Sequence, residues 1–395
     1  MLSLETRSII KATAPVLAQH GTTITTEFYR SLFEAHPELL NVFNHANQAK
    51  GRQQTALANT VYAAAVHIDN LETILPSVVQ IAHKHVSLGI VPEQYPIVGE
   101  YLLKAIKTVL GDAATPEIIN AWAEAYGVIA DVFISVEAGM YKKAEQQQNG
   151  WKLFKEFKVV GKVQESDAIT SFYLQPADGS KVPAYKPGQY ISVRVHIPGE
   201  TYMMIRQYSL SKAADEESFR ISVKRESDQD PNGKVSVYLH EQLEVGGTVE
   251  VTPPAGEFVL NEDRSTPVIM LAGGVGITPL MSMTERLLQS ASAREITFLH
   301  AARSEKEAAF VKELQQLSAS HEELTYQSFF SDTDNAFITR DVLAELPKSA
   351  DIYVCGPVGF MESMIANLVA LGFSEEQIHY EFFGPAMPVK ALTTA

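Results

Sequence analysis

Apolar residues in the first part of the chain recur every three or four positions, which is the period of helices that bury one face. The clearest stripe consists of Ile118, Trp122, Ala125, Ile129, Val132, Val136 and Met140. Thr115-Pro116-Glu117 precedes it with an N-cap, a first-turn proline and an acidic first turn. Helices are also predicted at 75–88 and 22–35, and Pro15 is expected to interrupt or end the first helix, which starts near Ser3. Residues 1–148 are therefore expected to form an all-α domain.

The pattern changes to an alternation of apolar and polar residues after the polar break at 146–150. Short strands are predicted at 157–163, 170–174, 191–195, 220–224 and 249–252. Pro187 and Gly188 form a turn before the strand that begins at Tyr190. Short strands separated by Gly/Pro turns favour a small antiparallel β-barrel, expected over 149–263.

The last third begins with the fully apolar run 267–272, which is typical of a buried parallel strand. Further strands are predicted at 295–300, 324–330 and 351–354, with a helix at 305–317. This alternation predicts an α/β domain with a parallel sheet over 264–395. The fold class is thus multidomain: an all-α domain, an antiparallel β-barrel and an α/β domain.

Composition restricts the function more than the fold. The chain has 395 residues and a formal net charge of −15, which argues against nucleic acid or an anionic membrane as a partner. The single cysteine, Cys355, excludes an internal disulfide framework and a multi-cysteine metal site. No uninterrupted apolar run approaches the length needed to cross a bilayer, and the N-terminus lacks the pattern of a signal peptide. A cytoplasmic protein is expected.

A candidate flavin seat lies at Arg206-Gln207-Tyr208-Ser209. An arginine and a tyrosine two residues apart on a strand point to the same side, so one can bind a phosphate while the other packs on an aromatic ring. The alternative is that Arg206 and Tyr208 lie on an ordinary exposed face of a strand and bind no cofactor. Downstream, Gly233-Lys234-Val235-Ser236 opens a predicted helix whose N–H groups can hold a pyrophosphate. Together these segments resemble the flavin domain of the ferredoxin–NADP reductase superfamily, and the resemblance implies that they bind FAD, with Tyr190 lining the same site.

A second candidate cofactor site follows the apolar run 267–272. There, Gly273-Gly274-Val275-Gly276-Ile277-Thr278-Pro279 joins a strand to a helix, as in units that cradle phosphate. By default the lone Cys355 is a small buried hydrophobe. The superfamily resemblance instead implies that Cys355-Gly356-Pro357 lies beside a nicotinamide. It also implies that the segment Phe382-Phe383-Gly384-Pro385 places Phe383 over the flavin. Arg303 and Ser304 follow the second predicted strand, which leaves the choice between NADH and NADPH open.

His85 is the candidate ligand of the helical region. Its neighbours three and four residues away are apolar, and a lone histidine on an apolar face is more often a core residue than a ligand. The wider segment is similar to bacterial flavohaemoglobins through motifs that include 28–30, 41–44, 51–54, 82–85 and 94–95. This resemblance implies that His85 is the proximal haem ligand and that Phe43 packs on the porphyrin. It places Tyr29, Gln53 and Leu57 on the distal side.

Glu137 stands at the edge of the apolar stripe of the last predicted helix, where a carboxylate needs a partner. A partly exposed glutamate is the alternative. The resemblance places Glu137 and Tyr95 on the proximal side, with the carboxylate accepting a hydrogen bond from the histidine and making it more electron-donating. It also extends catalytic roles to Lys84 and Glu381.

The motifs of the whole chain follow the order found in flavohaemoglobins. The resemblance implies an NAD(P)H-dependent nitric oxide dioxygenase that uses haem b and FAD to convert NO and O2 to nitrate. A flavin is needed because a hydride carries two electrons while haem iron accepts one. An NO reductase, a hydroperoxide reductase and a haem-based gas carrier or sensor are the alternatives. A monomer that needs no separate reductase is expected.

Overall fold

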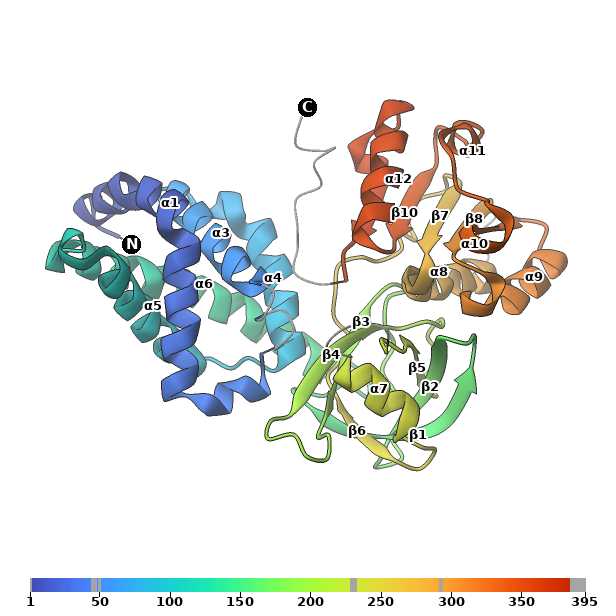
Figure 1. Ribbon diagram of the computed structural model, residues 1–395, viewed down its shortest axis with the longest axis horizontal. Helices are drawn as coiled ribbons and strands as arrows, with labels where there is room; N and C mark the ends of the chain where they lie inside the picture. Colours follow the sequence, from blue (N-terminus) through green and yellow to red (C-terminus); the bar gives the residue numbers. More distant parts are fainter. Residues whose placement is uncertain (1, 44–47, 49–50, 228–232, 291–293, 384–395) are drawn as a thin grey trace. The chain divides into compact units, whose positions relative to one another are not determined.

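The computed structural model describes residues 2–43, 48, 51–227, 233–290 and 294–383 (Figure 1). The chain divides into two compact units. The first comprises Met1–Gln147, Trp151–Phe154 and Arg194–Arg206, and the second comprises Gln148–Gly150, Lys155–Val193 and Gln207–Ala395. The hairpin at 194–206 is thus grouped with the helices, although its flanking strands belong to the sheet of the second unit.

The first unit is helical, as the period of its apolar residues predicts. Its α-helices are α1 (Leu4–Ala35), α3 (Arg52–Val66), α4 (Leu75–Leu88), α5 (Gln94–Leu110) and α6 (Pro116–Gln146). The Ser3 side chain caps α1, and the Thr115 side chain caps α6. The predicted break at Pro15 is wrong, because α1 is continuous through it. A proline removes one backbone donor, and the packing of α1 against α3, α5 and α6 compensates for that loss.

The helical core consists of two clusters of apolar side chains. One contains Phe28, Tyr29 and Leu32 of α1, with Phe43 and Leu57 packed against it. The other contains Val78 of α4, Tyr95 of α5, and Ala130 and Phe133 of α6. Tyr126 packs against both clusters.

Helix α6 is long and apolar enough to cross a membrane by length and composition alone. The prediction that no segment is long enough to cross a bilayer is wrong by this criterion, because it rests on uninterrupted apolar runs and α6 contains charged residues such as Asp131 and Glu137. Part of its surface is covered by protein: Trp122, Ala125 and Phe133 are buried in the helical core. These contacts give α6 the role of a core helix in the first unit.

The antiparallel sheet consists of six strands. These are β1 (Lys155–Gln164), β2 (Ile169–Pro176), β3 (Tyr190–Val195), β4 (Met204–Ser209), β5 (Phe219–Lys224) and β6 (Thr248–Val251). Their order is β4-β3-β6-β1-β2-β5, so β4 and β5 are the two edges. A bridge between Leu210 and Ile221 joins these edges and closes the barrel, which confirms the predicted architecture. Helix α7 (Lys234–Glu241) belongs to the same module.

The remaining strands form a parallel sheet in the order β11-β10-β7-β8-β9. They are β7 (Val268–Gly273), β8 (Ile296–Ala302), β9 (Leu324–Phe330), β10 (Asp351–Cys355) and β11 (Ile378–Glu381). Both faces are buried: α8 (Ile277–Gln289) and α9 (Val311–Ser320) cover one, and α11 (Arg340–Ala344) and α12 (Val358–Ala370) cover the other. The short helix α10 (Ser331–Asp334) follows β9.

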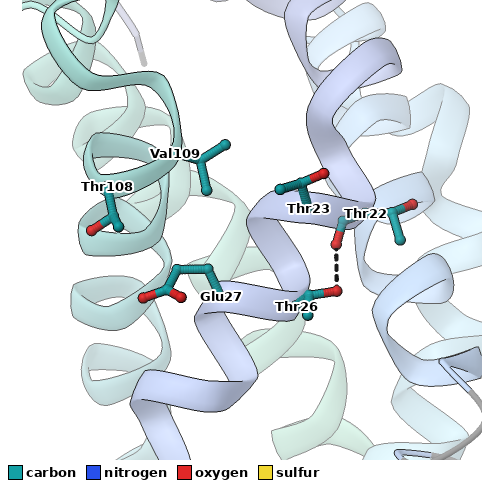
Figure 2. Close-up of a pocket in the computed structure, with 6 residues that line it drawn as sticks. All are labelled: Thr22, Thr23, Thr26, Glu27, Thr108 and Val109. Carbon is teal, nitrogen blue, oxygen red and sulfur yellow. Dashed lines mark hydrogen bonds between the residues drawn. The ribbon is translucent and has the colours of Figure 1, made fainter.

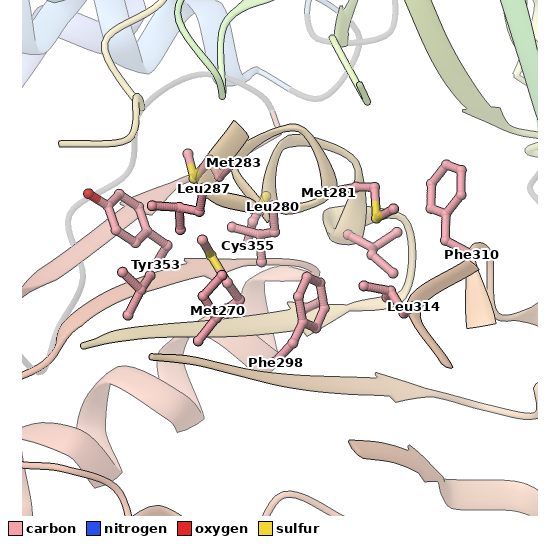
Figure 3. Close-up of a cluster of buried hydrophobic side chains, with 14 of the residues drawn as sticks. Met270, Leu280, Met281, Met283, Leu287, Phe298, Phe310, Leu314, Tyr353 and Cys355 are labelled. Carbon is pink, nitrogen blue, oxygen red and sulfur yellow. The ribbon is translucent and has the colours of Figure 1, made fainter. Parts of the chain in front are cut away.

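The helix predicted at 305–317 starts later than expected, at Val311. Phe310 precedes it with a φ of 61°, a left-handed conformation that does not continue a helix. The side chain of Phe310 is buried in the cluster shown in Figure 3. Tertiary packing therefore overrides the helical period of this segment.

The barrel and the parallel sheet share part of one hydrophobic core. Ile169 and Phe258 of the barrel module belong to the same cluster as Met283 of α8 and Phe310. In addition, the Asp167 amide donates to the Lys306 carbonyl at 2.8 Å. These contacts explain why the two modules fall into one compact unit.

Candidate functional site

His85, Tyr95 and Glu137 meet in the first unit, each from a different helix. His85 lies in the last turn of α4, Tyr95 near the start of α5 and Glu137 in α6. Glu137 Oε1 lies 2.7 Å from His85 Nδ1 and accepts a hydrogen bond from the Tyr95 hydroxyl at 2.6 Å. Glu137 is only 2% exposed, so it is a buried carboxylate with two partners and not a surface glutamate.

This arrangement determines which ring nitrogen of His85 donates a hydrogen bond to Glu137. The Tyr95 proton points to Glu137, and the carboxylate oxygen can only accept, so His85 Nδ1 carries the other proton. The lone pair of Nε2 is then available to a metal ion. Burial and the hydrogen bond to Glu137 raise the pKa of Tyr95, which keeps the phenol protonated as a donor. The cluster thus orients the imidazole through Nδ1 and leaves Nε2 as the nitrogen that can bind a haem iron.

The residues predicted for the distal side lie in the other helical cluster. The rings of Tyr29 and Phe43 pack edge to face, with centroids 5.7 Å apart. Tyr29 is 8% exposed, and burial raises the pKa of its hydroxyl. Leu57 of α3 packs against the same cluster. Gln53 Oε1 is buried and accepts no hydrogen bond from any described residue.

These observations fit a haem between the two clusters. A buried amide oxygen without a partner is costly unless a ligand supplies one. Phe43 and Leu57 provide the apolar contact that a porphyrin needs, and Tyr29 and Gln53 provide polar groups. The proximal cluster supplies the single imidazole. The residues present are therefore those that a haem site needs, with an imidazole supplied by one set of residues and apolar and polar side chains by the other.

A cavity of about 370 Å³ lies elsewhere in the helical unit, between α1 and α5 (Figure 2). Its lining consists of Thr22, Thr23, Thr26, Glu27, Thr108 and Val109. Figure 2 shows short polar side chains here, with Thr26 donating to the carbonyl of Thr22 at 2.7 Å. None of the six is a predicted site residue, and no imidazole or thiol lines the cavity. Its chemistry does not suit a haem.

The predicted flavin seat lies on β4, the edge strand of the barrel. Arg206, Gln207 and Tyr208 are half-buried, whereas Ser209 is buried. Gln207 Nε2 donates to Ser192 Oγ on β3 at 3.0 Å, and Arg206 Nη1 donates to the Ile205 carbonyl at 2.8 Å. Tyr190 starts β3, and its ring packs so closely on Gly256 that a Cβ there would come within 2.9 Å. The strand and its turn are therefore placed as predicted.

The predicted pyrophosphate turn at Gly233 precedes α7. Lys234 begins that helix, and Val235 and Ser236 are buried in its first turn. Ser236 Oγ donates to the Gly233 carbonyl at 2.9 Å. A Cβ on Gly233 would lie 2.7 Å from Ser236 Oγ and 2.8 Å from Glu226 Cβ, so a side chain here would make these neighbours shift. The first N–H groups of α7 remain those that an anion can use.

The second glycine turn packs directly against the strand that carries Cys355. A Cβ on Gly276 would lie 2.2 Å from the Cys355 carbonyl oxygen, and one on Gly356 would lie 3.0 Å from Gly273 Cα. Gly274 has a φ of +52° and open space where a side chain would stand. Val275 packs against the core, and α8 begins at Ile277, followed by the buried Thr278 and Pro279. The turn thus combines tight packing with an accessible backbone at the start of a helix.

Cys355 ends β10 at the carboxyl edge of the parallel sheet, beside Pro357 at the start of α12. It is fully buried, and burial raises the pKa of its thiol well above the usual value. Its Sγ lies 3.7 Å from the carbonyl oxygen of Glu381, which ends the neighbouring β11. The thiol is therefore a neutral, weakly polar group at the edge where ligands bind in such folds.

The predicted C-terminal segment is only partly described. Phe382 is half-buried and packs edge to face on Tyr380, whereas Phe383 is 48% exposed. Gly384 and Pro385 lie outside the described residues. Lys84 is half-buried on α4 next to His85, and its carbonyl accepts from Ser87 Oγ.

Sequence reasoning missed two residues that shape these sites. Phe133 lies one turn before Glu137, and its ring centroid is 5.7 Å from that of His85. Phe360 of α12 lies over the glycine turn, where a Cβ on Gly273 would come within 2.8 Å of its ring. The four-residue spacing to Glu137 was a signal for Phe133. Only the structure brings Phe360 to Gly273.

The sequence matches three protein families in succession. These are Globin over residues 26–133, the oxidoreductase FAD-binding domain over 156–260 and the oxidoreductase NAD-binding domain over 270–365. A curated flavohemoprotein of Bacillus cereus is 52% identical over 400 residues, covering 98% of this chain and 99% of the relative. Flavohemoprotein A of Dictyostelium discoideum is 49% identical, covering 97% and 98%.

Solved structures agree with these matches. The flavohemoglobin of Malassezia yamatoensis, determined with bound FAD and heme, aligns with a TM-score of 0.85 at 29% identity. The alignment covers 97% of this chain and 100% of that one. The FAD/NAD-binding domain of a nitric oxide dioxygenase from Vibrio cholerae aligns at 41% identity with a TM-score of 0.54, covering 58% of this chain and 99% of that domain.

Proposed function

The chain belongs to the flavohaemoglobin family, and on that premise we propose that it is an NAD(P)H-dependent nitric oxide dioxygenase that converts NO and O2 to nitrate. When bound, NAD(P)H, FAD and haem b together supply a two-electron donor, a carrier that releases electrons singly and an oxygen-binding iron. The supporting observation is that a globin and both reductase modules occur in one chain. A separate reductase is therefore not needed.

At the haem end, His85 is the proposed metal ligand. Glu137 and Tyr95 hold its ring through Nδ1, and Nε2 would be the nitrogen that binds a haem iron. Tyr29 and Gln53 are proposed to donate hydrogen bonds to a diatomic ligand that carries partial negative charge. Leu57 limits the space, and Phe43 packs on the porphyrin. For Gln53, the side-chain amide would be oriented with its NH2 group toward the ligand.

At the reductase end, Arg206 is proposed to bind a phosphate of FAD while Tyr208 stacks on the ring and Ser209 approaches it. Tyr190 and Gln207 line the same seat, and the Gly233–Ser236 turn holds the pyrophosphate. The turn from Gly273 to Pro279 is proposed to hold the phosphates of NAD(P)H. Cys355 and its neighbours Gly356 and Pro357 contact the nicotinamide, with Phe382 and Phe383 covering the flavin. Lys84 and Glu381 are proposed as catalytic residues on the basis of the family motifs.

Electron balance gives the test of this function. One NAD(P)H supplies two electrons, so about two nitrate ions should form per NAD(P)H when NO is added under air. The measurement is the yield of nitrate and the consumption of NAD(P)H on protein replete with haem and FAD. Formation of nitrous oxide in place of nitrate under air would overturn the proposal in favour of an NO reductase.

The proposal extends to organisation and setting. We propose three functional modules at 1–148, 149–263 and 264–395, which act in a cytoplasmic monomer with NO and O2 as its small-molecule substrates. The net charge of −15 supports the absence of a nucleic-acid or obligatory membrane partner. Sedimentation of the holoenzyme at several concentrations tests the monomer. A mass that rises with concentration would contradict it.

A further inference from the structure

Arg220 is a buried arginine at the contact between the barrel and the parallel-sheet module. It lies on β5, and only 5% of its surface is exposed. Its Nη2 donates to Glu285 Oε1 on α8 at 2.8 Å. Its guanidinium also lies over the ring of Phe310, with Cζ 4.8 Å from the centroid. An arginine is rarely buried unless its guanidinium is paired, and here Glu285 and Phe310 of the parallel-sheet module contact it.

The Glu285 carboxylate is bound by the barrel through both oxygens. Oε1 pairs with Arg220, and Oε2 accepts from the Ala213 amide at 2.7 Å. A second carboxylate, Glu313 of α9, lies 3.6 Å from Arg220 Nη1. The planar fork of one arginine therefore reaches two helices of the nicotinamide module, a geometry that a lysine cannot reproduce.

The barrel end of this contact is the seam that closes the sheet. Arg220 donates through Nε and Nη2 to the Ser211 carbonyl, and the Ser211 amide donates back to the Arg220 carbonyl at 2.8 Å. Ser211 follows Ser209, the last residue of the proposed flavin strand β4, by two positions. The guanidinium thus contacts the chain two residues after the end of the proposed flavin strand.

The other end of the contact is the helix of the nicotinamide turn. Glu285 lies in α8, which begins at Ile277 directly after the Gly274–Gly276 turn. Helices are stiff over this length, so a fixed Glu285 fixes where the turn lies relative to the barrel, while the turn itself is shaped by its own packing. Arg220 and Glu285 therefore link the proposed flavin strand β4 to α8, the helix that begins at the proposed phosphate turn of NAD(P)H.

We propose that the Arg220–Glu285 pair is a positioning contact for hydride transfer, which sets the separation between the flavin and nicotinamide rings. This inference rests on the proposed binding of FAD and NAD(P)H. In the step, a hydride leaves the dihydronicotinamide, which is oxidised to NAD(P)⁺, and its two electrons reduce FAD to FADH⁻. Neither NO nor haem takes part, so the step can be measured separately from nitrate formation.

The test compares variants that separate positioning from stability. Arg220→Met alone leaves a buried carboxylate unpaired and is expected to destabilise the fold. The double variant Arg220→Met/Glu285→Leu removes both charges and is expected to be more stable than Arg220→Met, although the Ala213 amide and the Ser211 carbonyl each lose a partner. Arg286 and Glu262 provide the matched control, because Arg286 is the next residue on α8 and pairs with Glu262 at 2.8 Å in an exposed position.

The measurements are single-turnover reduction of FAD by saturating NADH, its deuterium isotope effect and calorimetric binding of NAD⁺. In the double variant we expect flavin reduction to slow by on the order of tenfold or more with a changed isotope effect, because misplacement of reacting groups is costly. The affinity for NAD⁺ should stay within about twofold, since the phosphate turn is intact. The control Arg286→Gln/Glu262→Gln should reduce its flavin at the wild-type rate.

A double variant of wild-type stability that reduces its flavin at the wild-type rate would overturn the proposal and leave the pair a structural contact. If the double variant fails to fold, Arg220→Lys provides the same test, because it keeps the charge without the planar fork. A wild-type rate and isotope effect in Arg220→Lys would then overturn the proposal. Loss of nitrate formation with normal flavin reduction would instead count against the dioxygenase function alone.

Discussion

The helical unit and the reductase modules provide cofactor sites in different ways. In the helical unit, one nitrogen of His85 is the proposed attachment point, and Glu137 and Tyr95 orient it. In the reductase modules, the proposed sites consist largely of backbone turns, such as Gly273–Gly276 against Cys355. A side-chain site can be removed by one truncation, whereas a backbone site is damaged by adding atoms. The two kinds of site should therefore respond to opposite kinds of substitution.

The largest effect is expected from His85→Ala. The variant should lose its haem, because it lacks the imidazole that Glu137 and Tyr95 orient. FAD should remain bound and reducible by NAD(P)H, since its proposed site is built by other elements. Absorption spectra and cofactor content of the purified protein measure both. Wild-type haem content with an unchanged spectrum would remove His85 from the ligand role.

Gly276→Ala tests the backbone site by adding one methyl group. Its Cβ would lie 2.2 Å from the Cys355 carbonyl oxygen, so the turn or β10 must move. We expect a destabilisation of about 1–3 kcal/mol and weaker binding of NAD⁺. Gly359→Ala is the matched control, because a Cβ there meets nothing within 4 Å. Equal NAD⁺ affinity and stability in both variants, measured by calorimetry and thermal unfolding, would contradict the proposed crowding at this turn.

Arg206→Ala tests the proposed FAD site, which combines side chains of β4 with the backbone turn at Gly233. Loss of one charge-assisted contact to phosphate should cost about 1.5–3 kcal/mol, or roughly 10- to 100-fold in the Kd of FAD. Tyr208→Ala should in addition shift the flavin spectrum, since the ring loses its stacking partner. Reconstitution of the apoprotein with FAD measures these affinities. Wild-type affinity in both variants would argue against a seat on β4.

Glu137→Gln tests the support of His85 without removing the ligand. The amide is a weaker acceptor, so the imidazole donates less electron density and ferric haem is favoured less. The haem midpoint potential should rise, by roughly 60 mV if about 1.4 kcal/mol is lost for one electron. Glu124 lies on the same helix, and its carboxylate accepts a hydrogen bond from the Thr6 hydroxyl. Glu124→Gln should leave the haem midpoint potential unchanged. A lowered or unmoved potential in a spectroelectrochemical titration would contradict the proposed role.

The smallest effect concerns the choice of nicotinamide. Arg303 follows β8, where an arginine can receive the extra phosphate of NADPH, but it is held by Glu307 through two contacts of 2.9 and 2.7 Å. Because the Arg303–Glu307 pair is exposed, it stabilises the protein by at most about 1 kcal/mol. Glu307→Gln should therefore raise kcat/KM for NADPH relative to NADH by no more than roughly fivefold. Glu362→Gln, also at an exposed position, is the control. If Glu307→Gln leaves the NADPH-to-NADH ratio of kcat/KM unchanged, Arg303 does not take part in the choice of coenzyme.

Elements with a strong period could be predicted closely from the sequence. The helix expected at 75–88 and the strand expected at 324–330 have those bounds in the structure. The continuous α1 and the late start of α9 could not be predicted, because tertiary packing decided both. Local patterns report the preference of a segment and not the contacts that override it.

The candidate sites follow the same rule. His85 and Glu137 are 52 residues apart in sequence, and periodicity alone gave only an apolar surrounding for one and an edge position for the other. Their direct contact required the fold. Arg220 lies in an alternating strand pattern and reads as a solvent-facing residue, although it is buried. Its partner Glu285 is 65 positions away, so no local signal could have identified the pair.

The position of β11 has a consequence for biosynthesis. In the parallel sheet β11 is one of the two edge strands, and it pairs only with β10 among the described strands. It is also the last strand of that sheet to leave the ribosome, after the helical unit and the barrel have been synthesised. Domains generally fold as units during translation, so the globin can fold while the nicotinamide module is still incomplete. A nascent chain therefore cannot bring Cys355 beside Glu381, at the proposed nicotinamide site, before the whole globin has been synthesised.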